Sequence, residues 1–420
     1  MRVPPIYPHL ISGLDSYYRG SGSAKTESAR ALRTRSSRSA DLRILLSTFW
    51  KYPANGGLSN YLSALKSSLE KRGHRVDIIH PEFFPQRDLR AMHEKAEDEV
   101  RRFLRSRYGQ VNEDIVSSLR SMLSYEALLS TTDLKKYDVL HAQDRFTANI
   151  LGRLNQSYNK PLFFTSHGPM THRRVQLNLI KRGSVEEAYF FKIDRRAVEV
   201  ADKVVMLSEA LRPIFTDLGA DSRKLATIYT GIKLKQGSGK PKKDRLLISC
   251  VSRLSSRKGH KVLLDALHRI RQHLANVRVY IVGDGEMRGE LERLSSKLKL
   301  REVSFLGHRD DVADILSRSD IYVLPTTNDT LPISIIEAMF AGKAIVTTRC
   351  GGIPEIIRHQ ETGLLVDPEN VDQLAASLLQ LMQDRQLMKK LGNNALQFAK
   401  THLRTDKMAS KMEHLYQSVL

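Results

Sequence analysis

Short apolar runs alternate with longer amphipathic stretches along most of the chain. The runs at 42–48 and 246–251 are bounded by polar residues, a pattern typical of strands buried in a parallel sheet. The stretches between such runs place leucines at helical spacing, as between Leu58 and Leu69. Strands that alternate with helices in this way predict the α/β class, with helices covering both faces of each parallel sheet.

The alternation occurs twice and is interrupted once. Residues 233–244 read KLKQGSGKPKKD, a polar stretch of linker composition. It separates two predicted Rossmann-like domains, residues 42–232 and residues 245–400. Residues 1–41 are rich in Ser and Arg without sustained periodicity and predict a flexible basic tail. Residues 401–420 predict an amphipathic helix that packs back on the first domain.

Length and composition place the chain among globular proteins. Its 420 residues, 41% of them hydrophobic, suffice for two or three domains. The apolar runs are far shorter than the roughly 20 residues of a membrane-crossing helix, and the amino terminus lacks the basic-then-apolar order of a secretion signal. Cys250 and Cys350 lie in or beside strand-like runs, which indicates free thiols in a reducing compartment. A cytoplasmic location is therefore expected.

The net charge of +21 indicates that the surface attracts polyanions, so polyanionic partners must be considered. Proteins that bind single-stranded nucleic acid interleave basic and aromatic residues along a groove. Only 7% of the residues in this chain are aromatic, so nucleic acid is not expected as a partner. The charged helical stretch from Arg87 to Tyr137 has two interpretations. The commoner arrangement is a helical pair packed on the sheet edge. The alternative is a basic surface that lies peripherally on the inner, anionic face of the cell membrane.

Candidate chemistry concentrates between Ser319 and Glu355. This stretch reads as a strand, a polar loop with Asp329, a helix with Glu337, a second strand and a Gly-Gly-x-Pro-Glu turn. In parallel sheets such polar groups gather at the carboxyl ends of the strands, where ligands bind. Ser334 and Glu337 also fit a capping box, in which Glu337 would serve only the start of the helix.

A basic loop follows the apolar run at 246–251. It contains Arg253, Arg257 and Lys258 and ends at Gly259, where a helix is expected to begin. Cations beside a helix amino terminus predict an anion-binding site. The sequence assigns no partner to Arg257.

Two further candidates lie in the first domain. A turn with Gly56 and Gly57 follows the first strand, where Rossmann-like domains bring backbone close to a ligand, but the G-x-G-x-x-G fingerprint of nicotinamide cofactors is absent. His167 follows another predicted strand, and a histidine there is either structural or part of a binding site. No cluster of metal-ligand type stands out, so neither a metal nor another cofactor is expected.

These motifs together resemble the signature of the retaining GT-B glycosyltransferases of family four. The resemblance covers 42–420 and rests on two acids separated by seven residues, an Arg-(four residues)-Lys-Gly element and the amino-terminal glycine loop. It implies two Rossmann-like domains facing across a cleft, the second holding a nucleotide sugar and the first presenting the acceptor. The family usually has Glu where this chain has Asp329, and Asn-Gly-Ile-Asp where this chain reads Thr-Gly-Ile-Lys from Thr230.

The resemblance also implies roles for individual residues. The catalytic set is Asp329, His167, Arg253 and Lys258. The donor-binding set is Gly57, Arg253, Lys258, Gly283, His308, Thr330, Leu331, Pro332 and Glu337. Glu337 would accept hydrogen bonds from the ribose and Asp329 from the sugar, while the cations of the basic loop would bind the diphosphate.

The expected function is metal-independent, retaining transfer of a hexosyl group. The donor would be a nucleoside diphosphate sugar, with UDP as the first choice, and the acceptor a glycan or a lipid-linked molecule in cell-surface glycan synthesis. Two alternatives remain open. One is another GT-B enzyme, such as a sugar-nucleotide epimerase or a phosphorylase, and the other is a non-enzymatic polyanion-binding protein.

Overall fold

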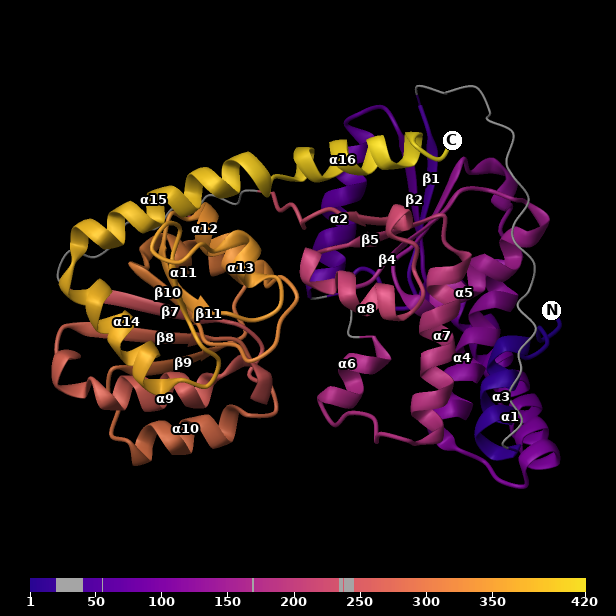
Figure 1. Ribbon diagram of the computed structural model, residues 1–420, viewed down its shortest axis with the longest axis horizontal. Coiled ribbons are helices and arrows are strands. Elements are labelled where there is room, and N and C mark those ends of the chain that lie inside the picture. Colours follow the sequence, from indigo (N-terminus) through magenta and orange to yellow (C-terminus); the bar gives the residue numbers. More distant parts are fainter. Residues whose placement is uncertain (20–40, 55, 168–169, 234–236, 238–244) are drawn as a thin grey trace. The chain divides into compact units, whose positions relative to one another are not determined.

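The computed structural model describes residues 1–19, 41–54, 56–167, 170–233, 237 and 245–420. These residues form two compact α/β units (Figure 1). Unit 1 comprises Met1–Leu207, Arg212–Ile228 and Ala409–Leu420, and unit 2 comprises Ser208–Leu211 and Tyr229–Met408. Of the predicted linker at 233–244, most positions lie outside the described residues.

Unit 1 is built on a six-stranded sheet in the order β2-β1-β3-β4-β5-β6, and all neighbouring strands in it are parallel. The strands are β1 (Arg43–Ser47), β2 (Arg75–Ile79), β3 (Val139–Ala142), β4 (Leu162–Thr165), β5 (Lys203–Met206) and β6 (Leu225–Thr227). Every residue of β3 and β4 is buried. A strand covered on both faces has no position that favours a polar side chain, which explains the continuous apolar runs of the sequence.

Helices surround this sheet. They are α1 (Pro8–Arg19), α2 (Gly57–Glu70), α3 (Gln86–Tyr108), α4 (Glu113–Leu129), α5 (Arg145–Leu154), α6 (Thr171–Gln176), α7 (Val185–Val200) and α8 (Arg212–Asp217). Helix α16 (Thr405–Gln417) begins in unit 2, and its residues from Ala409 onward belong to unit 1. There Tyr416 hydrogen-bonds His141 of β3 at 2.7 Å between the hydroxyl and Nδ1.

The flexible tail predicted for residues 1–41 is wrong for its first part. Helix α1 packs against α7 and buries Leu10 and Leu14, which share one face because they lie four residues apart. Tyr7, directly before the helix, is also buried. Asp15 also forms an ion pair with Arg107 of α3 at 2.7 Å. The short apolar stripe is hidden in the sequence by the Ser- and Arg-rich residues that follow. Residues 20–40 of the predicted tail lie outside the described residues.

The charged stretch after β2 forms a helical pair. Helices α3 and α4 pack against each other, and α4 also contacts α5 and α7. Arginines of the pair bind carboxylates within it, since Glu97 lies 2.8 Å from Arg101 and 3.0 Å from Arg120. No helix among the described residues is both long enough and apolar enough to cross a membrane.

Unit 2 repeats the architecture with the sheet order β12-β11-β10-β7-β8-β9. All its neighbouring strands are parallel. They are β7 (Leu246–Val251), β8 (Val277–Val282), β9 (Val303–Gly307), β10 (Ile321–Leu324), β11 (Ala344–Thr348) and β12 (Leu364–Val366). The central strands β10 and β11 are fully buried.

Two groups of helices flank this second sheet (Figure 1). Helix α9 (His260–Arg269) contacts α10 (Arg288–Lys297) and α14 (Val371–Gln383). Helix α12 (Ile333–Phe340) contacts α11 (Val312–Arg318) and α15 (Arg385–His402). The short helix α13 (Ile353–Ile356) follows β11. Apolar residues of both groups and of the sheet form one continuous buried core.

The strand order confirms the predicted α/β class with two Rossmann-like domains. In unit 2 the chain runs outward from β7 to β9 and then returns to β10 on the other side of β7, so the order reverses between β7 and β10. In unit 1 the corresponding reversal lies between β1 and β3. At such a reversal the connections after the two neighbouring strands lead to opposite sides. Open α/β sheets bind ligands outside the carboxyl ends of these two strands.

Candidate active site

Two loops meet at the reversal point of the second sheet. One follows β7 and contains the basic sequence Ser252–Lys258, and the other follows β10 and contains Thr326–Asp329. Because β7 and β10 are adjacent parallel strands, both loops leave the same edge of the sheet. This arrangement brings together candidate residues that are about 70 positions apart in the sequence.

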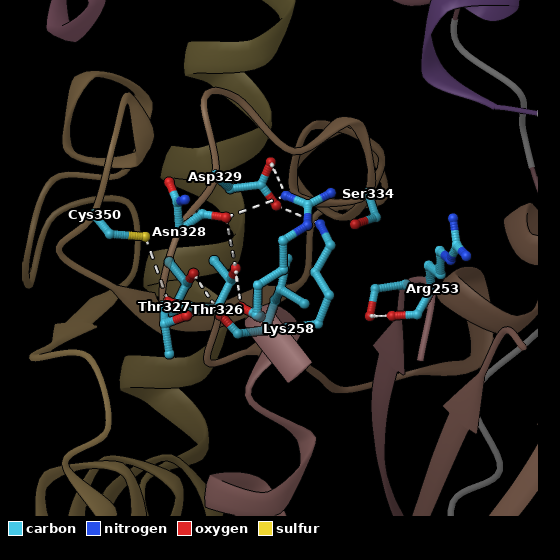
Figure 2. A network of polar contacts seen from close by, with 12 residues as sticks. Arg253, Lys258, Thr326, Thr327, Asn328, Asp329, Ser334 and Cys350 are labelled. Atoms are coloured by element: carbon cyan, nitrogen blue, oxygen red, sulfur yellow. Dashed lines mark hydrogen bonds and ion pairs between the residues drawn. The ribbon is translucent and has the colours of Figure 1, made fainter. Parts of the chain in front are cut away.

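Lys258 and Asp329 form an ion pair at the centre of this site (Figure 2). Their side chains are only 11% and 13% exposed, so water screens their attraction weakly. Arg257 approaches the other carboxylate oxygen at 3.8 Å. Asp329 therefore holds two cations beside one another, which concentrates positive charge at the carboxyl edge of the sheet.

Arg257, which the sequence left without a partner, holds the acidic loop in place. Its guanidinium donates to the carbonyl of Asn328 at 3.2 Å. Its own carbonyl accepts from the Thr327 amide at 2.8 Å and the Thr326 hydroxyl at 2.9 Å. On the far side of the loop, Cys350 donates to the Thr326 carbonyl at 3.4 Å. Arg257 is thus a positioning residue for the loop that carries Asp329.

Arg253 does not join the cluster. Figure 2 shows it apart from Lys258 and Asp329. Its side chain is 73% exposed and reaches Glu286 at 3.4 Å. The cause is local, because the next residue, Leu254, is fully buried and its amide donates to the Asp284 carbonyl. Anchoring Leu254 inward leaves the preceding side chain in solvent.

Two glycines, Gly259 and Gly351, allow neighbouring backbone to lie close to the acidic loop after β10. Gly259 has φ +73°, and a Cβ there would lie 1.9 Å from the Pro325 carbonyl oxygen. Gly351 has φ +51°, and a Cβ there would lie 1.7 Å from the Asp329 carbonyl oxygen. Only glycine fits these positions, since a side chain would have to displace backbone of the acidic loop.

Replacing Gly259 with alanine is expected to lower the free energy of unfolding by about 1–3 kcal/mol, because the added methyl group overlaps backbone. Gly289 in α10 is a matched control, because a Cβ there would meet only the flexible end of Arg293 at 3.5 Å. We expect Gly289→Ala to be neutral or to stabilise by about 0.5–1 kcal/mol. Chemical denaturation of both variants measures the difference, and equal stability would contradict the close approach.

Helix α12 presents the second acid of the motif. The capping-box alternative for Ser334 and Glu337 is not formed, because Pro332 occupies the N-cap and its side chain makes no capping hydrogen bond. Ser334 instead shares a hydrogen bond of 2.7 Å with the Tyr322 hydroxyl. Glu337 is half-buried and lies one turn into the helix.

The remaining donor-site candidates of unit 2 have separate locations. Gly283 directly follows β8 at φ +131°, where a Cβ would lie 2.0 Å from the Ser252 carbonyl oxygen. His308 follows β9 and is exposed, 3.4 Å from Asp310. Thr330 accepts at its carbonyl from the Gly352 amide at 2.8 Å, and Leu331 is buried. Both residues lie directly before Pro332, the N-cap of α12.

Glu355 of the Gly-Gly-x-Pro-Glu turn has a structural role in unit 2. Its carboxylate accepts from the Ser208 hydroxyl and from the amides of Glu209 and Ala210, each at 2.8 Å. Burial, together with the nearby Glu355, raises the pKa of Tyr229 to about 12. This acid therefore anchors the segment Ser208–Leu211 to unit 2.

His167 and Gly57 lie in unit 1. Gly57 begins α2. His167 directly follows β4, where its Nε2 lies 3.0 Å from Gln143 Oε1 and its ring packs edge-on against Tyr61 at 4.5 Å. Burial lowers the pKa of His167 to about 3, so the imidazole is neutral near pH 7. It can exchange hydrogen bonds with a hydroxyl but does not supply positive charge.

A metal site is not evident. Within the portions of the chain that the structure describes, no group of three or more His, Cys, Asp and Glu side chains has a metal-binding arrangement. The charged groups of the site are instead dominated by Lys258, Arg257 and Asp329.

Two family models match the chain and together span most of it. The model described as Glycosyltransferase Family 4 matches residues 55–236, and the model described as Glycosyl transferases group 1 matches residues 232–398. The two matches meet close to the boundary between the two units, so each covers one Rossmann-like domain.

Individual proteins are similar over different lengths. N-acetyl-alpha-D-glucosaminyl L-malate synthase of Bacillus anthracis is 28% identical over 238 residues, which are 54% of this chain and 62% of that protein. The chain thus spans less than two thirds of that relative. An uncharacterized glycosyltransferase of Methanocaldococcus jannaschii is 25% identical over 401 residues, 87% of this chain and 96% of that protein. The Anabaena protein HepE, solved in complex with UDP, superposes with a TM-score of 0.67 at 20% identity, covering 90% of this chain and 100% of that one.

Proposed function

Because the chain belongs to the GT-B glycosyltransferases, with family 4 sequence in its first half and group 1 sequence in its second, we propose that it transfers a hexosyl group from a nucleoside diphosphate sugar. UDP is the first choice of nucleotide, and the acceptor is a hydroxyl group of a glycan or a lipid-linked molecule used in cell-surface glycan synthesis. The observation that carries this proposal is the pair of cations, Lys258 and Arg257, held at the reversal point of the second sheet.

The donor diphosphate takes the place beside these cations. Lys258 is nearly buried, so its charge acts through a medium of lower dielectric than water and stabilises the charge that develops on the leaving β-phosphate. Arg253 lies on the same basic loop and is exposed, so it can turn toward the phosphates without breaking buried contacts. Together these groups supply positive charge, and the transfer therefore needs no divalent metal.

The two acids bind the hydroxyl-bearing parts of the donor. Asp329 accepts from hydroxyl groups of the sugar, and Glu337, one turn into α12, accepts from the ribose. Asp329 is one methylene shorter than glutamate, and its ion pairs with Lys258 and Arg257 fix the position of its carboxylate. In this proposal the sugar lies directly beside the diphosphate.

The reaction retains the configuration of the sugar. The bond from the anomeric carbon to the β-phosphate oxygen breaks, and its electron pair leaves with the nucleoside diphosphate. The acceptor oxygen bonds to the anomeric carbon from the same face, and its proton passes to the departing phosphate. His167, neutral because of burial, orients a hydroxyl by hydrogen bonding. The enzyme works in the cytoplasm or peripherally at the inner face of the membrane.

Thermal unfolding with UDP, GDP and ADP in the presence of EDTA tests donor binding. A nucleotide at 100 times its dissociation constant adds about 2.7 kcal/mol of stability. Glu337→Ala should weaken binding by about 1.5–3 kcal/mol, because a charged hydrogen bond to the ribose is lost. The control is Glu290→Ala on the exposed face of α10, where the acid pairs with Lys261. Equal nucleotide affinity in the two variants would refute the role of Glu337, and stabilisation that requires Mg²⁺ would refute metal independence.

A further inference from the structure

Unit 1 contains a cavity of about 820 Å³ at the reversal point of its own sheet. The loop after β1, the first turn of α5 after β3 and the segment after β4 line it, together with residues of α4 and α7. Its volume lies within the range of sites for small organic ligands, about 300–1,000 Å³. His167 is one of the lining residues, so the cavity reaches the group that we assign to hydroxyl binding.

One part of the cavity wall is aromatic. Phe49 packs on Phe146 at 4.8 Å and on Trp50 at 5.8 Å between ring centroids. Trp50 is 53% exposed, and Leu179 on the same cavity is 62% exposed. Large apolar side chains gain free energy when a ligand removes them from water. The aromatic wall therefore favours a ligand with an apolar or ring-shaped portion.

Another part of the wall is cationic. The guanidinium groups of Arg145 and Arg174 each lie 5.0 Å from the centroid of the Phe190 ring. Arg145 is neutralised by Asp194 at 2.7 Å. Within the described residues Arg174 forms no ion pair, and its pKa is lowered by burial and by the neighbouring Arg145. A ligand anion beside Arg174 would pair with its charge and offset the repulsion from Arg145.

The carboxylates around the cavity leave Arg174 available. Asp144 caps α5, accepting from the Thr147 amide at 2.8 Å and the Phe49 amide at 2.6 Å, and burial raises its pKa. Glu186 accepts from the Asn112 amide group at 2.5 Å. Asp114 is exposed in the first turn of α4. Each acid thus has its own hydrogen bonds or water.

We propose that this cavity binds the acceptor substrate and that the acceptor is an amphipathic anion, with a phosphate or carboxylate group on Arg174 and an adjoining apolar portion on Phe49, Trp50 and Phe146. Naming this ligand the acceptor rests on the proposed glycosyl transfer. Its identity as an amphipathic anion rests only on the cavity. The guanidinium fork pairs with either anion through two parallel hydrogen bonds, and the aromatic wall selects anions that carry an apolar group.

The only tryptophan of the chain, Trp50, makes the cavity directly observable. Titration of the nucleotide-free protein with octyl phosphate, below its micelle concentration, should change Trp50 fluorescence saturably. Inorganic phosphate should bind at least tenfold more weakly, because it lacks the apolar portion. Comparison of octyl phosphate with octanoate identifies the anionic group that the cavity prefers.

Arg174→Met keeps the apolar stem and removes the charge, and it should weaken octyl phosphate binding by tenfold or more. Arg173→Met is the matched control, because Arg173 lies on the same helix, pairs with Gln176 and does not line the cavity. Neutral octyl glucoside should bind equally to both variants, which verifies that they are folded. No saturable fluorescence change, or equal octyl phosphate affinity in the two variants, would overturn the proposal.

The octyl phosphate titration and the nucleotide stabilisation experiment can fail independently of each other. Nucleotide stabilisation with no response to octyl phosphate would overturn the acceptor class and leave glycosyl transfer standing. A response to octyl phosphate without stabilisation by any nucleotide would support the anion site and overturn its assignment to an acceptor.

Discussion

Lys258→Met should lower the turnover number by about two to three orders of magnitude, the loss typical when one preorganised group that stabilises transition-state charge is removed. Lys258 is the nearly buried cation of the site. Its charge has no substitute at the same position, because Arg257 lies farther from Asp329 and is also committed to the Asn328 carbonyl. The measurement is the rate of nucleoside diphosphate release at saturating donor, with the nucleotide identified by thermal stabilisation.

Lys261→Met is the matched control. Lys261 lies in α9, close to Lys258 in sequence, but it is about half exposed and pairs with Glu290. Exposed ion pairs contribute about 0–1 kcal/mol, so this variant should retain wild-type turnover. A Lys258→Met enzyme within threefold of wild type would show that the diphosphate is stabilised elsewhere, and Arg253 would become the first candidate.

Asp194→Ala should lower the free energy of unfolding of unit 1 by about 3–5 kcal/mol. Asp194 on α7 and Arg145 on α5 form a buried ion pair, with side chains 1% and 9% exposed. Removal of one partner leaves an uncompensated charge in the interior, which costs far more than the pair contributes. Because the only tryptophan lies in unit 1, urea unfolding followed by Trp50 fluorescence measures this unit alone.

Two further variants test whether the unpaired charge of Arg145, rather than the loss of side-chain contacts, causes the lower stability of Asp194→Ala. Asp221→Ala removes a surface pair in which Arg223 is 88% exposed, and it should change the stability by no more than about 1 kcal/mol. The double variant Arg145→Leu/Asp194→Leu should recover part of the loss, because no unpaired charge remains. A double variant less stable than Asp194→Ala would contradict this explanation.

The two units place their candidate sites by the same topological rule. In each sheet the strand order reverses once, and the loops at that point carry the charged or aromatic residues. The second sheet presents cations and acids, to which we assign the nucleotide sugar. The first presents an aromatic wall, a cation and a neutral histidine, to which we assign the acceptor. The division of labour proposed here thus follows from loop composition on a repeated scaffold.

Much of the fold follows from local patterns. Apolar runs such as Leu246–Val251 and Ala344–Thr348 are strands with the predicted bounds, because a central parallel strand tolerates few polar residues on either face. The acidic motif and the basic loop could also be found from sequence, since each directly follows such a strand. Their meeting follows from the strand order, which the alternation alone does not specify.

Some short patterns had two physical solutions, and the sequence did not decide between them. Ser334 and Glu337 have capping-box spacing, but Pro332 takes the N-cap and leaves Ser334 inside the first turn. Burial of Leu254 turns the side chain of Arg253 to solvent, an outcome that the basic loop sequence does not reveal. The apolar set of Tyr7, before α1, and Leu10 and Leu14, within it, is too short to stand out from the Ser- and Arg-rich residues after it.

The sequence by itself determined the α/β class and the two Rossmann-like domains, and it singled out the principal charged residues of the candidate site, because strand burial and loop chemistry act over a few neighbouring residues. Only the tertiary structure decided that Arg257 positions the acidic loop, that Lys258 and Asp329 pair, and that Trp50, Arg145 and Arg174 line one cavity. These contacts join segments distant in the chain, and the packing of the sheets that brings them together has no local signature.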